Sequence, residues 1–255
     1  MIIDWTVAAL CGFAFAAGFV DAVVGGGGLI QVPALFVLKP ELPPATLFGT
    51  NKLSSIVGTA NATWQYARRV KLPWRILLLT AGTAFVFAFL GARAVSHFNP
   101  NALRPLIIAL LVVVFVYTLI KKDFGRLHAP RLSLRQQHWC GLLIGAVIGF
   151  YDGFFGPGTG SFLVFAFVGL FGFSFLLASA AAKIVNLATN AAALAWFMPT
   201  GHVLYQAALP MAACNLAGSW CGARLALKRG SDFVRIFFIG VVALLLVRMT
   251  WDLLR

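Results

Sequence analysis

The sequence predicts an all-α integral membrane protein built from two inverted-topology repeats of about four to five helical segments each. Three observations predict this fold: an apolar composition, basic residues gathered in a few clusters, and a second half that resembles the first in register. Of the 255 residues, 61% are hydrophobic and 11% are charged. An ordinary soluble domain is about 45–50% apolar and about 25% charged. The composition therefore excludes a soluble globular protein.

Apolar runs divide the chain into two sets of expected helices. The first set comprises residues 5–24, 29–38, 45–66, 72–91 and 105–120, and the second comprises 139–151, 162–177, 178–198, 204–223 and 233–251. A helix needs about 17 residues or more to cross the hydrocarbon core. Because runs 29–38 and 139–151 are shorter, we expect broken or re-entrant helices there. We divide the chain into a first membrane repeat (1–120), a basic cytoplasmic connection (121–138) and a second membrane repeat (139–255).

Basic residues indicate which ends of the helices face the cytoplasm. The chain has 20 Lys and Arg against 7 Asp and Glu, a net charge of +13. Thirteen of the 20 fall in three clusters: Arg68, Arg69, Lys71 and Arg75; Lys121, Lys122, Arg126, Arg131 and Arg135; and Arg224, Lys228, Arg229 and Arg235. The positive-inside rule puts these clusters on the cytoplasmic side and the uncharged loop 199–205 outside. Because the clusters alternate with apolar spans, we expect no nucleic-acid partner.

The two halves align without a gap at a spacing of 131 residues. Over the 87 positions from Gly18 to Arg104, 16 residues are identical to their counterparts, against about seven expected by chance. The identities include rare charged residues, since Asp21 matches Asp152 and Lys52 matches Lys183. These matches favour an internal repeat over shared hydrophobicity.

Charge also predicts that the two repeats have opposite orientations. The loop after the third segment is basic in the first half and lacks Lys and Arg in the second. Equivalent loops then face opposite sides of the membrane, which is an inverted-topology repeat. Each half crosses an odd number of times, three or five, depending on whether its first two segments form a hairpin or each span.

Glycine-rich breaks interrupt a helix at matching places in the two halves. The breaks comprise Gly25, Gly26, Gly27 and Gly28 in the first half and Gly156, Pro157, Gly158, Thr159 and Gly160 in the second. In a helix interior glycine costs about 1 kcal/mol and proline about 3 kcal/mol. Irregular backbone inside a membrane is tolerated where it lines a wet cavity, and new helix N-termini there attract anions. The alternative is that the glycines only allow close helix packing.

Four ionisable residues lie within apolar segments: Asp21, Lys52, Asp152 and Lys183. Each costs at least about 2.5 kcal/mol at a helix centre, so such residues usually face a cavity or a partner. We expect the lysines to attract an anionic substrate, while the aspartates hold the lysines or carry a coupling proton. Structural salt bridges that fix helix positions are the alternative.

Small polar residues accompany both lysines at helical spacing. Ser55 and Thr59 share a face with Lys52, and Asn186 and Asn190 share a face with Lys183, at offsets of three and seven. Asn51 adds a further amide, although its counterpart is Ala182. We expect a polar lining for a substrate, with interhelical hydrogen bonding as the alternative.

The sequence offers no sign of enzymatic chemistry. It has no Gly-x-Ser-x-Gly or His-Glu-x-x-His motif, and no Walker A motif. The histidines lack metal-ligand spacing. We therefore expect a protein that is not an enzyme and holds neither a metal nor another cofactor.

The motifs around both breaks resemble one family. Residues 19–22 (FVDA), 25–33 (GGGGLIQVP) and 49–52 (GTNK), with 152–160 (DGFFGPGTG), are similar to the TauE/SafE family of sulfite-exporter-type membrane permeases. The resemblance covers nearly the whole chain. It implies a multi-pass protein of the bacterial inner membrane that moves anions, typically sulfite, organosulfonates or related organic acids.

These observations together predict a secondary transporter of a small anion that works by alternating access. Passive anion conduction, transport of an unrelated solute, or a docking subunit that transports nothing are the alternatives. The expected partners are the anionic substrate and the lipid bilayer, and a homodimer is left open.

Overall fold

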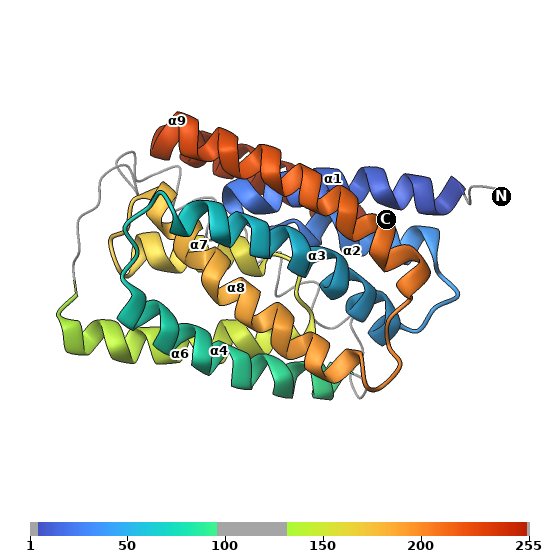
Figure 1. Ribbon diagram of the computed structural model, residues 1–255, viewed down its shortest axis with the longest axis horizontal. Coiled ribbons are helices and arrows are strands. Elements are labelled where there is room, and N and C mark those ends of the chain that lie inside the picture. Colours follow the sequence, from blue (N-terminus) through green and yellow to red (C-terminus); the bar gives the residue numbers. More distant parts are fainter. Residues whose placement is uncertain (1–4, 96–131, 254–255) are drawn as a thin grey trace.

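The computed structural model describes residues 5–95 and 132–253, and these residues form eight helices and no strands (Figure 1). The first half contains α1 (Trp5–Val24), α2 (Gly28–Leu38), α3 (Pro44–Ala67) and α4 (Trp74–Ala94). Proline begins α3 and also lies directly before α4, where its fixed φ suits the first turn of a helix. The expected segment 105–120 lies outside the described residues.

The second half repeats this order with α6 (Leu134–Phe154), α7 (Thr159–Gly169), α8 (Phe175–Phe197) and α9 (Tyr205–Leu253). Ser133 and Gln136 form a capping box at the start of α6, and Ser174 caps α8. Gly230, with φ of +76°, interrupts α9 between the expected segments 204–223 and 233–251.

Helix boundaries follow the repeat found in the sequence. Helices α2 and α7 are both 11 residues long, and they begin and end 131 positions apart. Helices α3 and α8 also begin 131 positions apart, as do α4 and α9. Figure 1 shows α3 and α8 running in opposite directions along the long axis of the bundle.

Three predicted boundaries were wrong. Helix α6 has 21 residues and begins at Leu134, so the run 139–151 is not a short helix and the last residues of the expected connection 121–138 are helical. The short helix of the second half is α7, the counterpart of α2. The runs 162–177 and 178–198 do not meet at residue 178, because α7 ends at Gly169 and α8 begins at Phe175. Gly172, with φ of +71°, lies in the loop between them.

Each helix that ends in a break packs on a helix of the other half. Gly145, Gly149 and Gly153 of α6 lie against the α4 backbone, at Thr80, Ala84 and Ala88. In the same way, Gly218 and Gly222 of α9 lie against the backbone of α1 at Phe15 and Phe19. Small residues allow this close backbone approach between helices in membranes. The packing holds both breaks in the interior of the bundle.

The outer surface is apolar along the helices. Leu78, Val147 and Leu209 are each at least 60% exposed, as expected for side chains that face lipid. Among the described helices, α1, α4 and α8 are long and apolar enough to cross a membrane. Figure 1 shows the α3–α4 turn, the start of α6 and the kink of α9 at the left end of the bundle. The α8–α9 loop and the N-terminus lie at the right end.

Candidate functional site

The two glycine breaks lie against each other at the centre of the bundle. A Cβ atom on Gly160 would lie 2.5 Å from Gly25 Cα, and one on Gly28 would lie 3.3 Å from Pro157 Cα. The equivalent residues Gly25 and Gly156 both have left-handed backbone, with φ of +78° and +91°, which glycine adopts without steric cost. The contact therefore requires glycine on both sides, and it brings the starts of α2 and α7 together.

Two buried ion pairs join the two halves of the chain. Lys52 Nζ of α3 lies 2.7 Å from Asp152 Oδ2 of α6. Lys183 Nζ of α8 donates a hydrogen bond of 3.0 Å to Asp21 Oδ2 of α1. Each lysine thus pairs with the aspartate of the other half. Removing one member of a buried pair typically costs about 3–5 kcal/mol, because the remaining charge is left without a partner.

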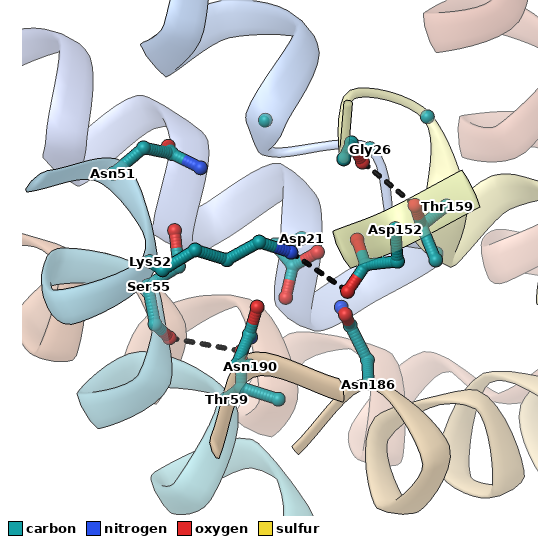
Figure 2. Close-up of a pocket in the computed structure, with 14 residues that line it drawn as sticks. Asp21, Gly26, Asn51, Lys52, Ser55, Thr59, Asp152, Thr159, Asn186 and Asn190 are labelled. Atoms are coloured by element: carbon teal, nitrogen blue, oxygen red, sulfur yellow. Dashed lines mark hydrogen bonds and ion pairs between the residues drawn. The ribbon is translucent and has the colours of Figure 1, made fainter. Parts of the chain in front are cut away.

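A cavity lies where the breaks and the ion pairs meet (Figure 2). It is lined by residues of six helices and of the two breaks: Asp21, Gly26, Gly28, Asn51, Lys52, Ser55, Thr59, Asp152, Gly156, Gly158, Thr159, Gly160, Asn186 and Asn190. The centre of a water molecule can move within about 20 Å³ of this space, which is room for about one water molecule. An anion of several heavy atoms fits only if some lining groups move apart.

Most of the residues expected from the sequence to bind substrate line this cavity, but three do not. Gly25 packs on Gly160 and Ser161, and Gly27 packs on Ala17 and the Asp21 side chain. Lys183 has no exposed surface and contacts Asp21 instead. The repeat therefore brings both lysines to the centre of the molecule, while Lys52 is the lysine that lines the cavity.

The lining offers both positive potential and hydrogen-bonding groups. Helices α2 and α7 begin at Gly28 and Thr159, and both residues line the cavity. Helix N-termini carry a partial positive charge and backbone N–H groups that favour anions. Asn190 Nδ2 donates to Thr59 Oγ1 at 3.5 Å, whereas Asn51 Oδ1 is buried without a hydrogen-bond partner. Figure 2 shows Lys52 extending towards Asp152, with Asn186 and Asn190 pointing towards the same space.

Two polar residues near the first break were not predicted from the sequence. Tyr66 donates its hydroxyl hydrogen to Ala22 O at 2.8 Å, and Ser179 donates to Val23 O at 2.7 Å. Both carbonyls belong to the last turn of α1, where no intrahelical donor remains. The sequence predicts that the carbonyl groups at this helix end need hydrogen-bond donors inside the membrane. The sequence does not predict which residues supply those donors, because the donors come from α3 and α8.

Comparisons with known proteins match the chain to one family over most of its length. A family model described as Sulfite exporter TauE/SafE matches residues 10–249. The chain is 34% identical to Probable membrane transporter protein ORF9 of Sinorhizobium sp over 239 residues, which are 94% of this chain and 90% of the relative. It is 33% identical to Probable membrane transporter protein YfcA of Escherichia coli (strain K12) over 243 residues, which are 94% of this chain and 87% of the relative.

A third relative, Probable membrane transporter protein of Haemophilus influenzae, is 32% identical over 238 residues, 93% of this chain and 92% of the relative. No solved structure matches the chain. The family match covers nearly all of the sequence and includes both glycine breaks and the four charged residues of the two ion pairs. The chain therefore belongs to the TauE/SafE family of membrane transporters.

Proposed function

We propose that the protein is a secondary transporter of a small anion, such as sulfite, an organosulfonate or a related organic acid. The observation that carries this proposal is the cavity between the two halves, where Lys52 and the starts of α2 and α7 surround one small space. An ammonium group and helix N-termini replace part of the hydration shell of an anion. The description of the family as sulfite exporters supports the same substrate class.

Transport then proceeds by alternating exposure of the cavity. The lining comes from both halves, so movement of one repeat against the other opens it to one side of the membrane and then to the other. Because the cavity has room for about one water molecule, the halves must separate before an anion of several heavy atoms can bind. The anion enters as the halves separate, and it binds to Lys52 in competition with Asp152.

The proposed setting is the bacterial inner membrane, with the two repeats in opposite orientations. The opposite directions of α3 and α8 support inverted topology. The basic turn 68–75 and the uncharged loop 199–205 lie at opposite ends of the bundle, which supports a cytoplasmic and an outer end. The partners are the anion and the lipid bilayer, with neither nucleic acid nor a cofactor, and a homodimer is compatible with the apolar outer surface.

Flux measurements on Lys52→Ala test this function. The purified protein is reconstituted into liposomes, and the movement of sulfite and of organosulfonates is measured. Wild-type protein should show saturable flux, and Lys52→Ala should abolish it because the cavity loses its ammonium group. Lys71→Ala is the matched control, since Lys71 is an exposed lysine in the α3–α4 turn, and it should retain wild-type flux.

Each alternative to an anion carrier gives a different result. Flux that does not saturate would indicate a passive channel. Saturable flux of another solute, with none for anions, would indicate a different substrate. A docking subunit would move no solute in either variant. Undiminished anion flux in Lys52→Ala would remove this lysine from the mechanism and contradict the proposed site.

A further inference from the structure

The two ion pairs occupy equivalent positions in the repeat, but their surroundings differ. Lys52 and Asp152 both line the cavity, whereas Lys183 is fully buried and only its partner Asp21 reaches the lining. The Asp21 side chain is 16% exposed, and its hydrogen bond with Lys183 is 3.0 Å long. A bound anion can therefore compete for Lys52 directly, while Lys183 is reached only through Asp21.

The helix end that carries Asp21 is tied to neighbouring helices. Tyr66 of α3 and Ser179 of α8 donate hydrogen bonds to Ala22 O and Val23 O, immediately after Asp21. Thr63 of α3 also donates to Lys183 O at 3.2 Å. These bonds fix the end of α1 to the helices that carry both lysines.

The equivalent end of α6, which carries Asp152, lacks the two corresponding hydroxyl donors. The residues 131 positions from Tyr66 and Ser179 are Phe197 and Phe48, and neither ring has a hydroxyl group to donate. The second break is instead braced within itself, since Tyr151 donates to Pro157 O at 2.5 Å and Thr159 Oγ1 donates to Gly156 O at 2.7 Å. The break that follows Asp152 thus carries two side-chain hydrogen bonds of its own, and the Lys52 contact joins Asp152 to α3.

Charge balance at the cavity indicates what accompanies the anion. With both pairs ionised, the two lysines and two aspartates sum to zero. A monovalent anion added to this buried cluster leaves one uncompensated negative charge, which is costly away from water. A proton on Asp152 removes that charge and frees the Lys52 ammonium group for the anion. The cluster then returns to neutrality with one proton and one monovalent anion bound.

Among the described residues, Lys52 is the charged side chain that forms an ion pair with Asp152. Helix α7 has no titratable side chain, and the arginines of α4 are exposed near its two ends. On α8, Lys183 is engaged by Asp21. The titratable and charged groups on the described helices around Asp152 are Lys52 and Tyr66 of α3, Lys183 of α8, Asp21 and Cys11 of α1, Arg75 and Arg93 of α4, and Arg135, His138, Cys140 and Tyr151 of α6.

We infer that Asp152 carries the coupling proton and releases Lys52 to the anion, while Lys183 and Asp21 form a fixed tie between the halves. This inference rests on the proposed anion transport. It assigns one proton to each monovalent anion and makes the transport step electroneutral. Proton and anion then bind cooperatively, because each removes the penalty for binding the other.

Liposome transport of methanesulfonate tests the assignment, because the charge of this anion stays constant over the pH range used. Wild-type protein should exchange labelled methanesulfonate at equilibrium, and an inward proton gradient should drive its accumulation. A potassium diffusion potential of either sign, set with valinomycin, should leave the initial rate unchanged. In Asp152→Asn, gradient-driven accumulation should be lost, and the remaining exchange should no longer respond to pH. Asp21→Asn/Lys183→Met, the repeat-matched control, removes the other ion pair and keeps the charge sum of the cluster at zero, so it should keep the pH response.

The outcomes separate the coupling from the proposed function. Absence of methanesulfonate exchange in wild-type protein would contradict both. Exchange without gradient-driven accumulation, or a rate that follows the membrane potential, would contradict the proton coupling alone. Accumulation in Asp152→Asn, or loss of the pH response in Asp21→Asn/Lys183→Met, would overturn the assignment to Asp152. If Asp152→Asn does not fold, the wild-type response to potential still decides whether transport is electroneutral.

Discussion

At the scale of single residues, the contact between Gly25 and Gly160 determines how closely the two halves approach. Each glycine lies where a Cβ atom of the other would collide with backbone. Backbone cannot move aside as a flexible side chain can, so a substitution there must separate the starts of α2 and α7. The same contact positions both helix N-termini at the cavity.

Replacing Gly160 with alanine should therefore destabilise the protein. The added Cβ would lie 2.5 Å from Gly25 Cα, and overpacking of this kind costs about 1–3 kcal/mol. Gly82→Ala is the matched control, because Gly82 lies in α4 with open space around its Cα. Alanine should be neutral or stabilising there, by up to about 1 kcal/mol, through its higher helix propensity. Thermal unfolding in detergent measures both variants, and equal melting temperatures would contradict the close contact.

Most residues of the cavity lining could be predicted from the sequence. The pairing of the aspartates with the lysines could not. The two breaks and the polar residues near Lys52 are recognisable because they are out of place in apolar segments. Sequence spacing could not tell which aspartate meets which lysine, since that depends on how the halves pack. It also gave no reason to separate Lys183 from Lys52, because the full burial of Lys183 depends on how the helices pack.

At the scale of helices, the Lys52–Asp152 ion pair links α3 to the end of α6. Lys52→Met alone should leave a buried carboxylate without its partner and reduce stability by about 3–5 kcal/mol. The double variant Lys52→Met/Asp152→Leu should recover most of that loss, because replacing a whole buried pair by apolar side chains is often neutral. Thermal unfolding of the two variants measures the difference. A double variant no more stable than the single one would show that the pair does not link these helices.

Helix boundaries were predictable where strong local signals coincide with changes in hydropathy. The glycine breaks separate α1 from α2 and α6 from α7 as expected. The boundary between α7 and α8 was missed because the sequence around it, Phe171-Gly172-Phe173-Ser174, is nearly as apolar as the helices. The start of α6 was missed because Arg135 and the three residues after it are polar, although the Ser133 capping box already begins a helix there.

At the scale of the whole molecule, the proposed orientation predicts which loops face each side of the membrane. The basic α3–α4 turn should be cytoplasmic, and the loop between α8 and α9 should face outward. Lys71 and Gly201 are each replaced by cysteine in a background without the four native cysteines. Labelling of each cysteine reports which side of the membrane its loop faces. An impermeant maleimide added to intact cells or right-side-out vesicles should label the cysteine at 201 and spare the one at 71. Labelling of both from one side would contradict the inverted repeat.

The meeting of the two halves at one anion-binding cavity is the central claim, and the position of a bound anion tests it most directly. The protein is crystallised with 2-bromoethanesulfonate, an anion that carries a bromine atom. The anomalous scattering of bromine then locates the bound anion directly. The account predicts a bromine peak between the starts of α2 and α7, with the sulfonate against Lys52. A peak elsewhere in the protein, with water alone between Lys52 and Asp152, would contradict it.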